Sequence, residues 1–451
     1  MTPDLDSAAA SREALVTAAL DELADWLRIP SISTAGGNPA GLRAAAEWAR
    51  RRVLAAGGTC ELVEEPGHPP LVVGELPANR PDAPTVLIYG HYDVQDPGDE
   101  ARWTSPPFEP DIRDGRLYAR GASDDKGNFL PLLLVACALA DAGALGVHVR
   151  VLIEGEEETP ADTAERWMAA DTRGADCAIV FDAGMLDERT PALTVATRGM
   201  VWADLVVTTG ERPAHSGEFG GAAMNAVHVL HRLLAAVLPD DRNRPPEPLR
   251  AGVEPPTEEE RAAWEALPPG DRLLAEAGAR PSDERAGAEF HLRTMAAPSL
   301  DVHRVRAGEP RTIVPERAEA SLSVRLAAGQ HSAEIAGALE RLLREALPAG
   351  ADLELRIHGA EPSRFDPHHP ALVAARDALE RATGTPPVVI RSGGSIPILA
   401  AFAQRGIPAV VGGFALPEDR IHAPDESYRL ESLELGLKAA YALYEALAAL
   451  R

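Results

Sequence analysis

Histidine and carboxylate side chains recur where short apolar segments of this chain end. The segment PTVLIYGHYDV ends in His91 and Asp93, and DCAIVFDAG ends around Asp182. The segment HVRVLIEGEEETP runs into an acidic loop, and RIHAPDES adds a histidine near the C-terminus. Imidazole and carboxylate groups suit Zn²⁺ or Mn²⁺, so these residues could hold divalent cations. The candidate residues are His91, Asp93, Asp124, Glu157, Glu158, Asp182 and His422.

The sequence YARGASDDKG, residues 118–127, places two adjacent aspartates between glycines and before an apolar run. Neighbouring carboxylates repel each other and lose solvation when they approach a core. One interpretation is a solvated turn in which Asp124 and Asp125 cap the following helix. The other is a cation site, in which Asp124 is the natural candidate for a carboxylate shared by two metal ions.

The order of apolar segments predicts how these residues come together. Strands are expected within 84–94, 148–160 and 176–184, with a buried helix at 128–143. This alternation is typical of an α/β layer with a mostly parallel sheet flanked by helices. Because the C-terminal ends of parallel strands meet at one edge of a sheet, we expect the candidate residues to converge there.

The pattern changes after residue 198. Two strands and a helix, followed later by strand, helix and strand, predict a smaller α+β domain at 199–363. The α/β pattern then returns, so this domain is expected as an insertion between 1–198 and 364–451. Within it, residues 239–290 are rich in Pro, Glu and Arg and are interpreted as a surface excursion.

The composition limits the classes of partner and the cellular location that can be expected for this protein. The 451 residues carry a formal net charge of −25, which argues against nucleic acid or an anionic membrane as a partner. The three cysteines are scattered and form no CxxC pair, so neither a disulfide framework nor a cysteine-based zinc site is expected. No apolar run reaches the ~18 residues that span a bilayer. We therefore expect a cytoplasmic protein.

Eight ordered blocks of the chain resemble one family of enzymes. They include YGHYDVQ, RDGRLYARGASDDKG, IEGEEET, AHSGEFGG, RTIVPERAEASLSVRL, RSGGSIPI and HAPDES. The chain resembles the co-catalytic metallopeptidases, which include carnosine-type dipeptidases, aminoacylases, succinyl-diaminopimelate desuccinylase and glutamate carboxypeptidases. The blocks GHYDVQ, HSGEFGG and GGSIP are most similar to the dipeptidase branch. The resemblance implies a zinc-exopeptidase-like catalytic domain with an inserted lid and dimerisation domain.

The resemblance also implies two divalent metal ions per chain, Zn²⁺ first, with Mn²⁺ or Co²⁺ as alternatives. Glu157 would be the general base for a hydroxide that bridges the ions, although GEEET leaves a shift by one position open. Asp93 would orient the ring of a ligand histidine. The implied ligands are His91 and Asp182 for one ion, Glu158 and His422 for the other, and Asp124 as the bridge.

Residues of the inserted domain and of the GGSIP block are implied in substrate binding. His215, in AHSGEFGG, would stabilise the oxyanion in the active site of a partner subunit, so a homodimer is expected. Arg325 would bind the substrate's C-terminal carboxylate through its planar guanidinium group. Thr312, Gly394 and Ser395 would complete that pocket.

The implied reaction is metal-dependent hydrolysis of an amide bond in a dipeptide or short peptide, which releases a C-terminal amino acid. An N-acyl-amino-acid amidohydrolase is the first alternative. A biosynthetic amide-forming enzyme or a binding protein of the same family is a further one. Segment 239–290 matches none of the family's blocks and has no assigned role.

Overall fold

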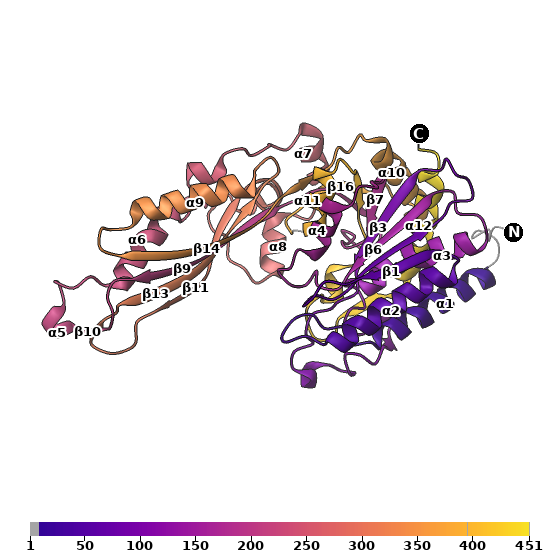
Figure 1. The fold of residues 1–451 in the computed structure, drawn as a ribbon. Coiled ribbons are helices and arrows are strands. Elements are labelled where there is room, and N and C mark those ends of the chain that lie inside the picture. The colour runs from indigo at the N-terminus through magenta and orange to yellow at the C-terminus, as the bar shows by residue number, and fades with distance from the viewer. Residues whose placement is uncertain (1–8, 395, 451) are drawn as a thin grey trace. The chain divides into compact units, whose positions relative to one another are not determined.

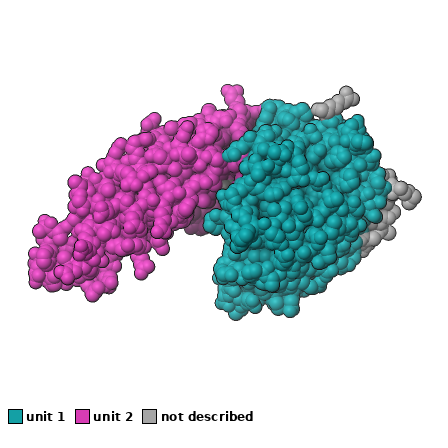
Figure 2. All heavy atoms as spheres, viewed as in Figure 1, with its two compact units in different colours: residues 1–195, 365–389, 401–451 teal, residues 196–364, 390–400 magenta. Residues whose placement is uncertain are grey.

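The computed structural model describes residues 9–394 and 396–450, which fall into two compact units (Figure 2). The first comprises Met1–Val195, Phe365–Val389 and Ala401–Arg451, and the second comprises Ala196–Arg364 and Ile390–Ala400. The expected insertion at 199–363 lies within the second unit. Residues 390–400 were expected in the first domain but cluster with the second, where Arg198 binds the carbonyl groups of Gly393 and Gly394.

The first unit is built on a mixed sheet with a parallel centre, which confirms the predicted fold class. Strands β6, β3, β7 and β17 run parallel, while β1, β2 and β8 are added antiparallel. The central strands are buried along almost their whole length, as expected of strands covered by helices on both faces. In order across the sheet they are β1 (Thr59–Val63), β2 (Leu71–Leu76), β6 (His148–Glu154), β3 (Thr85–His91), β7 (Cys177–Val180), β17 (Ala409–Val411) and β8 (Ala192–Thr197).

Helices flank this sheet (Figure 1). Helix α3 is buried over most of its length and packs on β3 and α12, which explains the apolar run after the two aspartates. Helix α2 begins at Pro39, and the side chain of Asn38 caps it by accepting from the backbone of Gly41. The helices are α1 (Ala9–Leu27), α2 (Pro39–Ala55), α3 (Lys126–Asp141), α4 (Thr163–Ala170), α10 (Pro370–Thr383), α11 (Pro397–Gln404) and α12 (Leu430–Leu447).

A small antiparallel sheet brings two distant loops together. Its strands are β4 (Asp111–Arg113), β5 (Arg116–Tyr118) and β18 (Ser427–Arg429), and Tyr118 pairs with Ser427. The segment after β5 contains Asp124, and the segment before β18 contains His422. This pairing therefore joins residues that are about three hundred positions apart in the sequence.

The second unit is a four-stranded antiparallel sheet with helices α6 and α9 packed on one face (Figure 1). Burial alternates along β9, as a sheet with one covered face requires. The sheet contains β11 (Ser299–Ala307), β13 (Arg317–Leu326), β9 (Gly199–Thr208) and β14 (Asp352–Ala360), and the helices are α6 (Ala226–Val237) and α9 (Ser332–Ala346).

Shorter elements complete the chain. They are β10 (Ala214–His215), α5 (Ser216–Phe219), β12 (Ile313–Val314), α7 (Glu258–Trp264), α8 (Gly270–Glu276), β15 (Ser363–Arg364) and β16 (Val388–Ser392), the 3₁₀ turns Glu100–Arg102, Glu247–Arg250 and Pro417–Asp419, and the π-turn Leu292–Ala296.

In the described part of the chain, no helix is both long enough and apolar enough to cross a membrane.

Candidate metal centre

Strand register brings the candidate residues to one edge of the first unit's sheet. His91 is the last residue of β3 and pairs with Glu154, the last residue of the parallel strand β6. Glu157 and Glu158 follow β6 after a short turn, and Asp182 follows β7, the neighbour of β3 on its other side. The expected convergence at strand ends therefore occurs in the structure.

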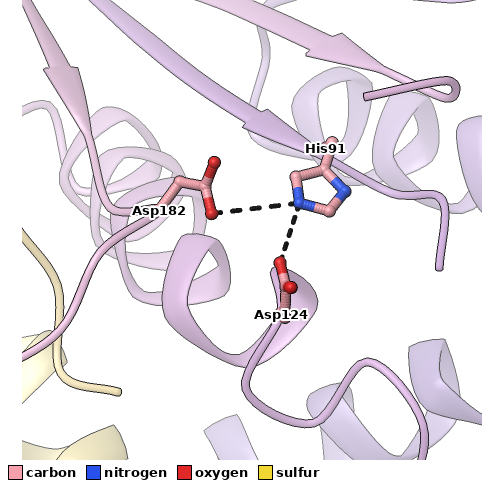
Figure 3. Close-up of side chains that lie close together, drawn as sticks. All are labelled: His91, Asp124 and Asp182. Carbon is pink, nitrogen blue, oxygen red and sulfur yellow. Dashed lines mark hydrogen bonds and ion pairs between the residues drawn. The ribbon is translucent and has the colours of Figure 1, made fainter. Parts of the chain in front are cut away.

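Two groups of side chains lie close enough to hold a metal ion each, and Asp124 belongs to both. In the first, the Nε2 atom of His91 lies 3.1 Å from Oδ1 of Asp124 and 4.0 Å from Oδ1 of Asp182 (Figure 3). In the second, Nε2 of His422 lies 2.9 Å from Oδ2 of Asp124 and 3.0 Å from Oε1 of Glu158. The two carboxylate oxygens of Asp124 thus face two different groups, as a bridging ligand would.

Asp93 controls the orientation of His91. The Nδ1 atom of His91 lies 3.1 Å from the backbone carbonyl of Asp93 and 3.3 Å from its carboxylate. A hydrogen on Nδ1 satisfies these acceptors and leaves Nε2 free to bind a cation. The same carboxylate accepts hydrogen bonds from Ser33 at 2.6 Å and from the backbone N–H groups of Glu157 and Glu158. Asp93 therefore fixes the histidine and the acidic turn together.

The three consecutive glutamates have three different surroundings. Glu156 is buried and its carboxylate lies 3.0 Å from Nδ1 of His68, outside both metal groups. Glu158 contacts His422 and accepts a hydrogen bond from Gln95 at 2.8 Å. Burial, together with neighbouring carboxylates, raises the pKa of Glu157 to about 7. The geometry therefore favours Glu157 and Glu158 over a register shifted by one position.

A buried carboxylate holds the backbone around Asp124. Glu426 accepts hydrogen bonds from the N–H groups of Gly121, Ser123 and Asp124 at 2.9–3.1 Å, and it pairs with Arg120 at 2.7 Å. Because the loop's N–H groups are bound by this one side chain, the carboxylate of Asp124 stays directed at the two histidines.

The interpretation of the aspartate pair as a solvated, capping turn is wrong. Asp125 immediately precedes α3, but its side chain makes no capping hydrogen bond and is fully buried. One of its oxygens lies 3.3 Å from the backbone nitrogen of His91, and Asp125 belongs to neither metal group. The peptide bond between Asp124 and Asp125 is cis.

The charges and donor atoms of the cluster suit divalent cations. Hydrogen bonds to Asp124 and Glu158 raise the pKa of His422 to about 10. Burial opposes protonation of His91, yet hydrogen bonds to Asp124 and Asp93 raise its pKa well above the ordinary value. The carboxylates thus stabilise the protonated, positively charged form of the two imidazoles, and a bound cation would be stabilised in the same way. Nitrogen and oxygen donors of this kind fit Zn²⁺ or Mn²⁺.

Residues for which the sequence patterns predicted no role also support the site. They include Ser33, His68, Gln95 and Glu426, each of which contacts a candidate ligand, its neighbour or its loop. Gln95 and Glu426 lie in the blocks GHYDVQ and HAPDES, close to candidate ligands, and this proximity is the signal that could have identified them.

His215 and Thr312 lie together in the second unit. His215 is exposed, and its Nδ1 accepts a hydrogen bond from the backbone of Gly217 at 3.1 Å. The carbonyl of Thr312 accepts from the N–H of Ser216 at 3.0 Å. His215, on β10, pairs with Ile313 of β12, which directly follows Thr312 and precedes the start of β13 at Arg317. Both residues therefore lie beside the end of the four-stranded sheet at which β13 begins, where Figure 1 labels β10.

Arg325 lies at the other end of that sheet. It is eight positions from Arg317 along β13, which corresponds to about 26 Å of strand, and it pairs with Met200. One chain therefore does not bring Thr312 next to Arg325, although both were expected in one pocket.

Gly394 lies beside Arg198, also in the second unit. The backbone N–H of Arg198 donates to the carbonyl of Gly394 at 3.1 Å, and its Nε donates to that of Gly393 at 3.1 Å. Burial, and next the positive charge of Arg325, lower the pKa of Arg198 to about 10. Arg325 pairs with Ser299 across the sheet, and the hydroxyl of Ser299 accepts a hydrogen bond from Arg198 at 3.4 Å. Arg325 thus lies close to the arginine that binds the glycine loop. Ser395, the remaining candidate, lies outside the described residues.

Comparison with known proteins gives consistent matches. The model of peptidase family M20/M25/M40 matches residues 87–446. The chain is 33% identical over 370 residues to a cysteinylglycine-S-conjugate dipeptidase of Corynebacterium striatum, covering 77% of each chain. It is 28% identical to the Beta-Ala-His dipeptidase of Homo sapiens, covering 74% of this chain and 69% of that one. An M20 family metallo-carboxypeptidase structure from Sulfolobus solfataricus has a TM-score of 0.85 at 27% identity, covering 96% and 99%.

Proposed function

The chain belongs to peptidase family M20/M25/M40, and from that premise we propose that it hydrolyses dipeptides and releases the C-terminal amino acid. The dipeptidases among its relatives support the substrate class. The observation that carries the proposal is Asp124, which presents one carboxylate oxygen to His91 and the other to His422. A carboxylate shared in this way suits a two-metal hydrolytic site.

Two divalent cations, Zn²⁺ in the first instance, would be held in this centre. His91 and Asp182 would bind one ion, Glu158 and His422 the other, and Asp124 both. When bound, such ions lower the pKa of water and polarise the scissile carbonyl group. Asp93 keeps the Nε2 atom of His91 available, and Gln95 holds one oxygen of Glu158.

Glu157 would transfer the proton. Its carboxylate would take a proton from the attacking water and then deliver it to the amine nitrogen that leaves. Hydrogen bonds from the backbone of Glu157 and Glu158 to Asp93 fix the turn that carries this carboxylate. Glu156 is engaged with His68 and is not available for this role.

The free carboxylate of the substrate would be bound by Arg325 and the Gly394 loop, where the neighbouring Arg198 adds positive charge. His215 would stabilise the oxyanion, with Thr312 beside it. Because His215 lies beside one end of the four-stranded sheet and Arg325 lies near the other end, we propose that a homodimer supplies His215 and Thr312 from the partner subunit. The three cysteines are unpaired, which supports a cytoplasmic location.

A substrate screen tests this proposal. The purified protein, loaded with Zn²⁺ or Mn²⁺, would be assayed against Cys-Gly, β-Ala-His and Ala-Gly, and against matching N-acetyl amino acids, with product identification. We expect hydrolysis of dipeptides with release of the C-terminal residue, at least tenfold faster than any N-acyl substrate. Faster cleavage of N-acetyl amino acids would instead identify an amidohydrolase.

A further inference from the structure

An ion pair is buried in the second unit, away from the candidate ligands in sequence. Arg391 is 1% exposed and Glu260 is 4% exposed. The guanidinium group of Arg391 binds both carboxylate oxygens of Glu260, with Nε at 2.8 Å from Oε1 and Nη2 at 2.7 Å from Oε2. Nη1 of Arg391 also donates to the carbonyl of Glu254 at 3.2 Å. This bidentate geometry fixes the two side chains relative to each other.

The pair joins the surface excursion to the glycine loop. Glu260 lies on α7, within the segment 239–290 that had no role in the sequence, and the N–H of Thr257 donates to it at 2.7 Å. Arg391 lies on β16 and is followed directly by Ser392 and the two glycines of the loop.

Thr294, just beyond the excursion, also contacts the loop. A Cβ atom added at Gly393 would lie 2.9 Å from the carbonyl oxygen of Thr294, so only glycine allows this approach. Arg198 binds the carbonyl groups of both glycines. The loop is therefore held by Arg391 before it and by Thr294 and Arg198 beside it.

The excursion is also tied to the strand that carries Arg325. Just beyond β13, the side chain of Gln330 donates to the carbonyl groups of Leu249 and Ala251, at 3.1 and 2.9 Å. The N–H of Glu254 donates to the carbonyl of Ala328 at 2.8 Å. The excursion thus connects the end of β13 to the loop that contains Gly394.

We propose that the excursion is a brace for substrate recognition, in which the Glu260–Arg391 pair positions the Gly394 loop against Arg325 to receive the substrate's C-terminal carboxylate. Glu260 and Arg391 are positioning residues, because they act through the loop and not on the substrate. Small displacements of a binding group weaken recognition strongly, so loss of the pair would lower the affinity for the substrate's C-terminal carboxylate. This inference rests on the proposed function.

The test compares dipeptides that differ only in their C-terminal group. Steady-state kinetics would be measured with Ala-Gly and with its C-terminal amide, for the full-length wild-type protein and for Glu260→Gln. Glu260→Gln keeps the volume of the side chain and removes its charge. We expect KM for the dipeptide to rise about tenfold with little change in kcat, and the preference over the amide to fall by the same factor.

Asp240→Asn is the matched control, because Asp240 pairs with an arginine of the same segment, Arg244, but is exposed and hydrogen-bonds to Arg242 and Arg244. It should leave the preference unchanged. If Glu260→Gln does not fold, Arg391→Lys retains the charge but loses the bidentate fork, and the same fall in preference is expected.

Equal losses on the dipeptide and the amide, or no loss at all, would overturn the positioning role. A wild-type protein that cleaves the amide as well as the free dipeptide would instead refute carboxylate recognition in the proposed function. The two failures are therefore distinguishable.

Discussion

At the residue scale, the chemistry depends on how each carboxylate is used by its neighbours. Asp124 shares its two oxygens between two histidines, while Asp125, one position later, is buried against the backbone of His91. Glu156 is bound to His68, whereas Glu158 faces His422. Neighbouring residues of the same type thus lie in different surroundings because different long-range partners face them.

Replacement of Glu157 tests the proposed proton transfer. Glu157→Gln keeps the shape of the side chain but cannot accept a proton, so we expect kcat to fall roughly 10²–10⁴-fold, the usual contribution of a general base. Metal content should stay at the wild-type value, because Glu157 is in neither ligand group. Steady-state kinetics and elemental analysis of the same preparation would measure both.

Glu156→Gln is the control for this prediction, since it makes the same change one position away. Its kcat should stay within a few-fold of the wild type. If Glu156→Gln were inactive while retaining its metal, and Glu157→Gln lost metal, the assignment within GEEET would be shifted by one position.

At the element scale, most of the fold and much of the site could be predicted from the sequence. Apolar segments that end in polar residues identified the strands carrying His91 and Asp182, because burial on both faces leaves a clear pattern. The contacts of Glu426 with the Asp124 loop could not be predicted, since they link residues about three hundred positions apart. The clustering of residues 390–400 with the second unit depends in the same way on contacts with Arg198.

Segment 239–290 illustrates the same limit of local pattern. Its Pro, Glu and Arg content indicated a solvated surface, yet Glu260 is buried against Arg391. A charged residue is predicted to be exposed unless a buried partner is known. The partner of Glu260 is Arg391, which lies 131 positions later in the chain.

At the scale of the whole molecule, the proposed role of His215 implies a dimer. His215, on β10, lies beside the end of the four-stranded sheet at which β13 begins. Arg325 lies near the other end, about 26 Å further along β13, which is far more than a dipeptide spans. If both act on one substrate, they come from different chains. The closed two-fold symmetry of a dimer would then build two equivalent active sites.

Mixed dimers test this arrangement. His215→Ala and Glu157→Gln should each be nearly inactive alone, but a co-expressed pair should recover activity. Random pairing makes about half of the dimers mixed, and one of two sites in each is intact, so about a quarter of wild-type activity is expected. Absence of recovery, despite dimers that contain both tagged chains, would show that each site is completed within one chain.

The most direct measurement for the central claim is the metal content of the wild-type protein, Asp124→Asn and His422→Ala, determined by elemental analysis after dialysis. We predict about two divalent ions per wild-type chain, about one in His422→Ala and close to none in Asp124→Asn, because Asp124 belongs to both ligand groups. An Asp124→Asn variant that retained both ions would contradict the account.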